Sequence, residues 1–257
     1  MPKFAANLSL MFTELSFLER FDAAADAGFT AVECQFPYEA AADSVAERLQ
    51  RHAIELVLFN MPPGNWAAGD RGLATLSERK SEFKEGVATA LDYARVCGSK
   101  RLHLMAGIGD PTDAAAVDSY RANLAYAAEL SARDGVTVLI EPINRRDMPG
   151  YFLSDYELAT ELISTIGSDS LRLQFDIYHR QMICGRVLDG LRELLPIVGH
   201  IQIAGVPGRH EPCNGELDFP TIFAEIDRLG YDGFIGCEYR PRAETSAGLG
   251  WLAPYLL

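Results

Sequence analysis

Four short apolar runs of the chain carry a residue type that binds metal ions through oxygen. Carboxylate and amide oxygens are the ligands that Mg²⁺ and Mn²⁺ prefer in proteins. Helix-like segments separate the runs, so strands ending at one place would bring these oxygens together and form a divalent metal site. The residues, with their runs, are Glu141 in VTVLIE (136–141), Asp176 in LRLQFD (171–176), Gln202 in HIQIA (200–204) and Glu238 in FIGCE (234–238).

The chemistry that such a site favours is the movement of a proton between neighbouring carbons. A metal bound to adjacent carbonyl and hydroxyl oxygens acidifies the carbon between them, and a carboxylate can then remove the proton. Glu141 and Glu238 could flank a ligand and act as this acid/base pair, through a cis-enediolate. Each of the four residues, taken alone, could equally cap a loop at a strand end. G-x-S-x-G, H-E-x-x-H and Walker A motifs are absent from the sequence.

Two further polar residues near the strand ends could contact a substrate. His179 lies three residues after Asp176, and we expect it on a loop above the metal, donating a hydrogen bond to a substrate oxygen. Its alternative is a loop histidine bonded to the backbone. Arg209, in GVPGRHEP, could neutralise a carboxylate or an enolate oxygen. Its alternative is a surface salt bridge.

Three residues have supporting interpretations. His103 and Glu33 lie toward the ends of two predicted strands, and either could hold a neighbour of the metal or of the base, or serve packing alone. Trp66 lies in MPPGNWAAGDRG, whose glycines and prolines suit a shaped lid closing over a small ligand. The alternative for Trp66 is packing on the rim.

Charge and composition exclude several classes of protein. The net charge is −13, which argues against non-specific binding of duplex DNA, so no nucleic-acid partner is expected. No apolar stretch approaches the roughly 20 residues of a membrane helix, and MPKFAANLSLMF lacks the apolar core of a signal peptide. We therefore expect a cytoplasmic protein without membrane contact. The five cysteines are scattered without a C-x-x-C, which argues against disulfides or structural zinc.

The alternation of apolar runs and helical patterns predicts the fold. Eight strands alternating with helices in 257 residues fit a single-domain (β/α)₈ TIM barrel over residues 1–257. The rival is a doubly wound open sheet, but Gly107-Ile-Gly109 fails as a dinucleotide motif because Thr112 replaces the third glycine. The predicted strands are 4–9, 31–36, 54–59, 101–106, 136–141, 171–176, 199–204 and 234–239.

Helix ends and long loops add detail to this prediction. Capping boxes are expected at Ser16 with Glu19 and at Ser154 with Glu157, and Asp218 is expected to cap a third helix. Gly28, Gly98, Gly167 and Gly230 should end helices. The long irregular stretches all follow strand ends, which in a barrel lie on the face that carries active sites. They are 60–77, 142–153 and 204–218.

Motifs spread almost from end to end carry a family resemblance. They are FAANLSLMF, FNMPPGNWAAGDRG, LIEPINRRDMPGYF, FDIYH, GHIQIAGVPGRHEP, NGELDFPTIF and GCEYRPR. With these motifs the chain resembles the hydroxypyruvate isomerase family, within the xylose-isomerase-like barrels. The resemblance implies a barrel with one divalent metal ion, Mg²⁺ or Mn²⁺. It also implies a set of roles: metal ligands Glu141, Asp176, Gln202 and Glu238, acid/base residues Glu141 and Glu238, and substrate contacts His179 and Arg209.

The resemblance implies hydroxypyruvate as the substrate, with 2-oxo-tetronate as the alternative, because the motifs are mixed between the two activities. EPINRRDMPGYF and FDIYH are similar to the enzymes that interconvert hydroxypyruvate and 2-hydroxy-3-oxopropanoate (tartronate semialdehyde). MPKFAANLSLMFTE, HLMAG and QIAGVPGRHEP are similar to the 2-oxo-tetronate isomerases. Either substrate is a small anionic hydroxy-oxo acid. Whether the chain forms a homo-oligomer stays open, although related barrels often associate.

Other classes fit the sequence less well. Related ketose 3-epimerases carry histidine at the position of Gln202. A zinc endonuclease of the same superfamily needs a histidine-rich zinc cluster and a basic groove, whereas this chain has five histidines and a charge of −13. A non-catalytic binding barrel would not need both Glu141 and Glu238.

Overall fold

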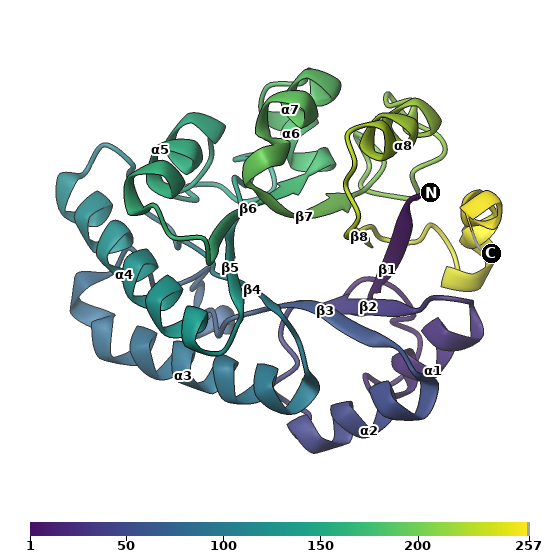
Figure 1. Ribbon diagram of the computed structural model, residues 1–257, viewed down its shortest axis with the longest axis horizontal. Helices are drawn as coiled ribbons and strands as arrows, with labels where there is room; N and C mark the ends of the chain where they lie inside the picture. Colours follow the sequence, from purple (N-terminus) through teal and green to yellow (C-terminus); the bar gives the residue numbers. More distant parts are fainter. Residues whose placement is uncertain (256–257) are drawn as a thin grey trace.

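Eight parallel strands form a closed barrel in the computed structural model, which describes residues 1–255. Each strand pairs with the next in chain order, and β8 pairs with β1 to close the ring (Figure 1). The predicted (β/α)₈ barrel is confirmed, and the doubly wound open sheet is wrong. The strands are β1 (Lys3–Asn7), β2 (Ala31–Cys34), β3 (Glu55–Asn60), β4 (Arg101–His103), β5 (Thr137–Ile140), β6 (Leu171–Asp176), β7 (Val198–Ile203) and β8 (Phe234–Cys237).

Helices surround the barrel on its outside (Figure 1). The α-helices are α1 (Glu19–Asp26), α2 (Ala42–His52), α3 (Lys80–Cys97), α4 (Ala114–Arg133), α5 (Tyr156–Ile166), α6 (Ile177–Ile183), α7 (Val187–Leu194) and α8 (Phe219–Arg228). Short 3₁₀ segments are η1 (Trp66–Ala68), η2 (Ser77–Arg79), η3 (Leu195–Ile197) and η4 (Thr245–Tyr255). Of the helices within residues 1–255, none is both long enough and apolar enough to cross a membrane.

Several predicted helix ends are confirmed. The side chain of Asp218 accepts a hydrogen bond from the backbone N–H of Thr221 and caps α8. Gly98 ends α3 and Gly167 ends α5, each in the left-handed conformation that favours glycine. These ends set where the chain turns back toward the next strand.

Two predicted capping boxes are corrected. Asp155, not Ser154, caps α5, because its carboxylate accepts the backbone N–H of Leu158 at 2.7 Å. At the first helix, Glu19 accepts hydrogen bonds from both the backbone N–H and the hydroxyl of Ser16. The bond to the backbone N–H is one of the two bonds of a capping box, but the hydroxyl donates instead of accepting. The N–H groups of Glu19 and Arg20 bond to the Ser16 carbonyl, so α1 has no side-chain cap.

Strand β4 ends three residues before the predicted 101–106. Leu104 still donates its backbone N–H to Leu139 of β5, but the backbone of Ala106 bonds to loop residues instead. Ala106 accepts a hydrogen bond from the N–H of Thr75 and donates its own N–H to the Tyr151 hydroxyl. This segment therefore supports the loops above the barrel.

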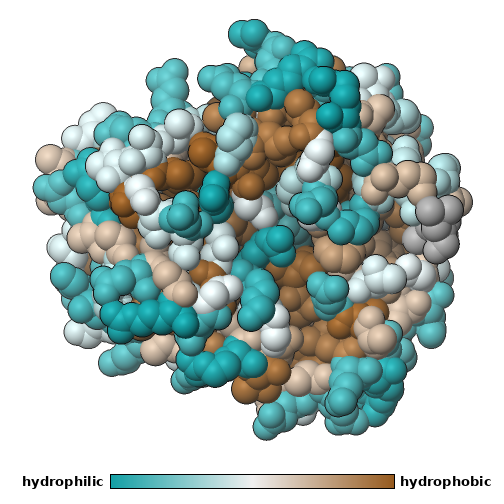
Figure 2. Space-filling model, viewed as in Figure 1, coloured by the Kyte–Doolittle hydropathy of each residue, from teal (hydrophilic) through white to brown (hydrophobic). Residues whose placement is uncertain are grey.

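Apolar side chains fill two regions. The larger cluster lies between the strands and the outer helices, and includes Phe83 and Val87 of α3. A smaller one joins residues of β1, β2, β3 and β5, and because β5 pairs with none of these three strands it must lie inside the barrel. Its members are Ala5, Ala31, Val57, Leu58 and Leu139. On the surface, hydrophilic residues cover much of the outer ring, with apolar residues in the recesses between them (Figure 2).

A buried polar network centred on Glu33 occupies the barrel interior. Glu33 is fully buried and accepts hydrogen bonds from the side chains of Asn7 at 2.8 Å and Gln202 at 2.7 Å. The Nε2 of His200 lies 2.6 Å from its second oxygen. Strands β2 and β7 are not neighbours, so these contacts cross the barrel. Satisfied polar groups of this kind hold the strand ends above them in place.

Gly236→Ala is expected to lower the free energy of unfolding by about 1–3 kcal/mol, the usual cost of overpacking a core. A Cβ on Gly236, in β8, would collide with the carboxylate of Glu33, which is fixed by its network. Urea denaturation measures the effect. Gly250→Ala is the matched control, because a Cβ there meets no atom within 4 Å. Equal stability of the two variants would contradict the close packing at Gly236.

All five cysteines are free, which agrees with the predicted absence of a disulfide framework.

Candidate active site

A cavity of about 510 Å³ opens at the carboxyl ends of the strands. Each of the three long stretches predicted after strand ends contributes to its wall, through Trp66, Asp147 and Arg209 among others. These loops therefore lie on the face of a barrel where active sites are formed. A second cavity of about 670 Å³ lies at the opposite end, between strand beginnings such as Arg101 and Thr137.

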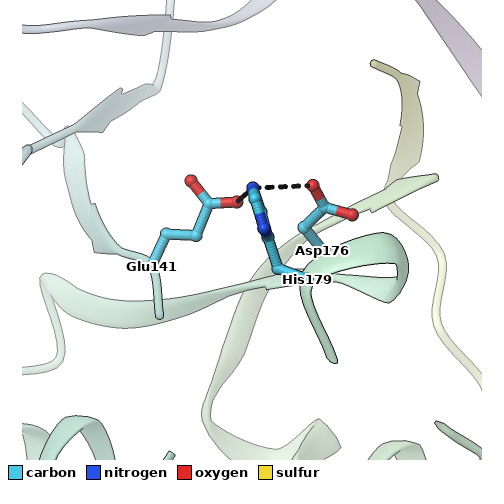
Figure 3. A group of neighbouring side chains, drawn as sticks. All are labelled: Glu141, Asp176 and His179. Atoms are coloured by element: carbon cyan, nitrogen blue, oxygen red, sulfur yellow. Dashed lines mark ion pairs between the residues drawn. The ribbon is translucent and has the colours of Figure 1, made fainter. Parts of the chain in front are cut away.

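Two buried carboxylates and a histidine meet beside the first cavity, and two of the three, Glu141 and His179, line it. Glu141 directly follows β5, Asp176 ends β6 and His179 lies in the first turn of α6 (Figure 3). One potential ligand atom from each lies within 4.8 Å of the others. The Nε2 of His179 is 3.9 Å from Glu141 and 3.6 Å from Asp176. The structure thus brings together two of the four predicted metal ligands and a predicted substrate contact.

The helix α6 explains why His179 faces the carboxylates. His179 was expected on a loop, but Asp176 accepts the backbone N–H of Tyr178 at 2.7 Å and caps α6 immediately after the strand. The loop assignment is therefore wrong. Asp176 uses Oδ1 for the cap, while its Oδ2 is buried without a hydrogen-bond partner in residues 1–255.

Burial and mutual repulsion make these carboxyl groups weak acids. Burial, followed by the neighbouring charges of Glu238 and Asp176, raises the pKa of Glu141 well above its ordinary value. Burial raises the pKa of Asp176 to about 7, although Arg209 opposes the shift. Glu141 Oε1 likewise has no hydrogen-bond partner among the described residues. Orphaned, buried carboxylate oxygens are what a hard divalent cation would neutralise, so the residues fit such an ion.

The proton on His179 can be placed from its contacts. Its Nδ1 accepts the backbone N–H of Asn144 at 3.3 Å and lies 2.7 Å from the Asn144 side-chain amide. Burial lowers the pKa of His179 well below its ordinary value, so the ring is neutral at physiological pH. A neutral ring with an accepting Nδ1 carries its proton on Nε2, which faces Glu141 and Asp176. That atom is a donor, consistent with a substrate contact.

Arg209 bridges the carboxylates on the other side of the cavity. Its Nη2 lies 2.7 Å from Glu238 and 3.5 Å from Asp176, and its guanidinium lies 5.0 Å from the Tyr178 ring. Asp147 is 3.8 Å from its Nη1. Burial lowers the pKa of Arg209, but the charges of the surrounding carboxylates outweigh it and keep the pKa above its ordinary value. The structure therefore places Arg209 inside the site and not in a surface salt bridge.

Glu238 and Gln202 lie outside the tight cluster. Glu238, directly after β8, is buried and faces Arg209 and the amide of Gln35 at 3.2 Å. Burial raises the pKa of Glu238, and Arg209 opposes that shift. Gln202 donates to Glu33 and accepts from Gln174 at 2.6 Å. Metal binding by Glu238 and Gln202 stays a prediction.

The supporting residues have distinct places. Glu33 accepts a hydrogen bond from the amide of Gln202, and its role beside a metal ion stays a prediction. His103 Nε2 lies 3.7 Å from Glu141, and burial lowers the pKa of His103 to about 3, so it is neutral. Trp66 lies at the cavity rim, 41% exposed, 5.3 Å from the Phe36 ring. Closure of Trp66 over a ligand stays a prediction.

Sequence reasoning missed several residues of the site. Asn144, which orients His179, and Asp147, which lies beside Arg209, are both in the loop after β5. Gln35, which donates to Glu238, directly follows β2. Each lies only a few residues along the sequence from Glu141 or from a strand end, which could have indicated a place in the site. Polar residues are common in such loops, however, so this position alone does not distinguish them.

Comparison with known proteins identifies the relatives of this chain. The family model described as xylose isomerase-like TIM barrel matches residues 21–255. The chain belongs to this family. That result agrees with the barrel fold and with the superfamily expected from the sequence motifs.

Proteins that match this chain over its full length are named as isomerases. The chain is 54% identical to the 2-oxo-tetronate isomerase of Cupriavidus necator, over 100% of this chain and 99% of that protein. It is 40% identical to the hydroxypyruvate isomerase of Escherichia coli, over 99% of this chain and 100% of that protein. These matches place the chain among enzymes of the isomerase class and confirm the resemblance to the hydroxypyruvate isomerase family.

A solved structure agrees closely with the fold. The crystal structure of a protein from Brucella melitensis described as an AP endonuclease, family 2, has a TM-score of 0.98 and 46% sequence identity, covering 100% of both chains. Its description differs from the names of the isomerase relatives.

Proposed function

We propose that this protein is a divalent-metal-dependent isomerase of small hydroxy-oxo acids, with Glu141 and Glu238 as its acid/base pair. The observation that carries the proposal is that two buried carboxyl groups line one cavity and that burial raises both pKa values. A general acid or base works best when its pKa lies near the working pH.

A metal ion is part of the proposal. Bound Mg²⁺ or Mn²⁺ would polarise the carbonyl and hydroxyl oxygens of the substrate and acidify the hydrogen on the carbon between them. In support, two carboxylate oxygens of the site, on Glu141 and Asp176, have no hydrogen-bond partner among residues 1–255. The residues proposed to hold the ion are Glu141, Asp176, Gln202 and Glu238.

The protein's own groups carry the proton. One glutamate removes the hydrogen from C3, next to the carbonyl carbon, and leaves an enediolate. The other assists delivery of a proton to C2, while the proton of the C3 hydroxyl passes to the C2 oxygen, so that the carbonyl moves from C2 to C3. Hydroxypyruvate would yield 2-hydroxy-3-oxopropanoate, and 2-oxo-tetronate would yield 3-oxo-tetronate. We assign His179 Nε2–H as a donor to a substrate oxygen, and Arg209 as the counter-charge to the enediolate.

We place the four-carbon 2-oxo-tetronate first among the substrates. In support, the relative of that name shares 54% identity over the whole chain, compared with 40% for the named hydroxypyruvate isomerase. Hydroxypyruvate remains the second candidate because EPINRRDMPGYF and FDIYH resemble the three-carbon enzymes. The proton transfer is the same for both.

Abasic-site DNA cleavage is less well supported. A DNA-binding surface needs basic groups to neutralise phosphates, and this chain has a net charge of −13. Within residues 1–255, the one group of three potential metal-binding side chains is Glu141, Asp176 and His179, which contains a single histidine.

Product analysis by NMR tests the proposal. Metal-loaded protein is given 2-oxo-tetronate and, separately, hydroxypyruvate, with a chelated sample and an abasic-site DNA substrate as controls. We expect faster conversion of the four-carbon acid, no reaction after chelation and intact DNA. Conversion of neither acid would overturn the isomerase proposal, and faster conversion of hydroxypyruvate would reassign the substrate.

A further inference from the structure

The proposed substrates carry a carboxylate, and the arginine already assigned to the site has little free charge to offer it. Arg209 faces three carboxylates, Glu238 at 2.7 Å, Asp176 at 3.5 Å and Asp147 at 3.8 Å. Its positive charge therefore offsets negative charges of the protein. The proposed metal ion would lie among the buried carboxylates of the site, so a further cation in the cavity wall could bind the carboxylate of an anionic substrate.

Arg71 is a cation that forms no ion pair with a carboxylate of the described chain. It is half-buried and lines the same cavity as Glu141 and His179. Its Nη1 donates to two backbone carbonyls, of Trp66 at 3.1 Å and of Asp70 at 2.7 Å. Within residues 1–255, no carboxylate lies within ion-pair distance of it and its Nε and Nη2 form no hydrogen bond.

The Asp70 carboxylate, adjacent in sequence, is already occupied. It lies 2.7 Å from Nη1 of Arg79 and accepts the backbone N–H of Asn65 at 2.6 Å. Arg71 still acts on it at longer range, as one of the charges that lower the pKa of Asp70. Asp70 thus ties the loop together, and the guanidinium of Arg71 keeps free donors.

The guanidinium of Arg71 is held in a defined orientation. Its central carbon lies 3.8 Å from the centroid of the Trp66 ring, as in a stacked cation–π pair. The next residue, Gly72, has a φ of +114°, and a Cβ there would collide with the backbone carbonyl of Met105. Only glycine allows this approach, which fixes the backbone beside Arg71. A planar fork fixed in this way is preorganised to bind a carboxylate through two hydrogen bonds.

Within the described chain, the other unpaired arginines of the cavity lack the burial and the stacking of Arg71. Arg146 and Arg240 also line it, but both are exposed side chains at its outer edge. Exposed, mobile cations are screened by solvent and salt. Arg71 is the half-buried arginine that combines a stacked guanidinium with free donors.

We infer that Arg71, stacked on Trp66, forms the subsite that binds the carboxylate of the substrate and selects hydroxy-oxo acids over neutral ketoses. The inference rests on the proposed function and names the group that recognises the acid. The ligand of this subsite is a small carboxylate that carries an oxygen on the adjacent carbon.

Kinetics of Arg71→Gln test this subsite. We expect KM for 2-oxo-tetronate to rise by about 10- to 100-fold, the loss of a charge-assisted hydrogen-bond pair, with a much smaller change in kcat. Erythrulose, which replaces the carboxylate with a neutral hydroxymethyl group, should be handled equally by wild type and variant. Arg71→Lys retains the charge but not the fork and should fall between the two.

Two arginine variants serve as comparisons. Arg133→Gln, on the exposed side of α4, removes the same charge away from the cavity and should leave KM unchanged. Arg240→Gln removes a cation from the cavity edge. A KM increase in Arg240→Gln that equals or exceeds that in Arg71→Gln would overturn the inference, as would an unchanged KM in Arg71→Gln.

A binding measurement separates this inference from the proposed function. The chain has two tryptophans, so Trp251→Phe leaves Trp66 as the fluorescent reporter beside Arg71. We expect glycerate, but not glycerol, to change the fluorescence of Trp66, and Arg71→Gln in this background to weaken glycerate binding at least about tenfold.

Arg71-dependent glycerate binding without turnover of any hydroxy-oxo acid would refute the isomerase and retain the subsite. Turnover with glycerate binding unaffected by Arg71→Gln would refute the subsite and retain the isomerase.

Discussion

Glu238→Gln is expected to lower kcat by about 10²- to 10⁴-fold, the range that a general acid or base contributes. Glutamine keeps the shape of the side chain and can still accept the hydrogen bond from Arg209, which is 2.7 Å long in the native site. It cannot take a proton from carbon. Steady-state kinetics measure the loss, and glycerate binding should persist. Metal content is determined in parallel, so that loss of the ion is not mistaken for loss of the acid/base group.

Glu211→Gln is the matched control for this variant. Glu211 is also a buried glutamate near the same loops, but it accepts the backbone N–H of Arg242 at 3.0 Å and sits outside the cavity wall within the described chain. The kcat of Glu211→Gln should stay close to that of the native protein. Normal turnover by Glu238→Gln would remove Glu238 from the acid/base pair.

Removal of the metal is expected to abolish turnover, and the stabilisation by metal should grow with pH. In the metal-free protein the pKa of Asp176 is raised to about 7 and that of Glu141 is also raised. The folded state therefore binds these protons more tightly than the unfolded state, whose carboxyl pKa values are about 4. The metal-free protein loses stability as the pH rises from about 4 to about 7. A metal ion binds the ionised carboxylates and restores the stability that the protein loses as the pH rises.

Thermal unfolding with a chelator and with saturating Mn²⁺ tests this prediction. The increase in Tm on adding Mn²⁺ should be larger at about pH 8 than at about pH 5, because only the ionised carboxylates bind the ion. Asp176→Asn is the informative variant: it removes a buried charge, so its chelated form should be more stable than the native chelated form above pH 7, with a diminished response to Mn²⁺. Unchanged turnover after exhaustive chelation would rule out the metal.

The barrel and the location of its site could be predicted from local sequence patterns. Apolar runs of strand length, followed by capped helices, indicate a parallel sheet whose strand ends share one face. Glu141, Asp176 and Glu238 could be grouped because each closes such a run. The barrel is closed and all three side chains are buried, but only Glu141 and Asp176 belong to the tight cluster, whereas Glu238 faces Arg209.

The exact use of each side chain could not be predicted in this way. Whether His179 lies on a loop or a helix depends on which oxygen of Asp176 caps the chain, and its protonated nitrogen depends on Asn144. Gln202 is held by Glu33, which is 169 residues away in the sequence. Such contacts cross the barrel and leave no periodic signal along the chain.

By itself, the sequence determined the alternation of strands and helices, the three carboxylates at strand ends and the acidic charge that disfavours nucleic acid. These properties are local or additive, so spacing and composition are enough to determine them. Only the tertiary structure decided that Arg209 is already paired with carboxylates and that Arg71 stacks on Trp66 with free donors. The availability of a charge depends on distances to its neighbours and on burial, which exist only once the loops have packed above the closed barrel.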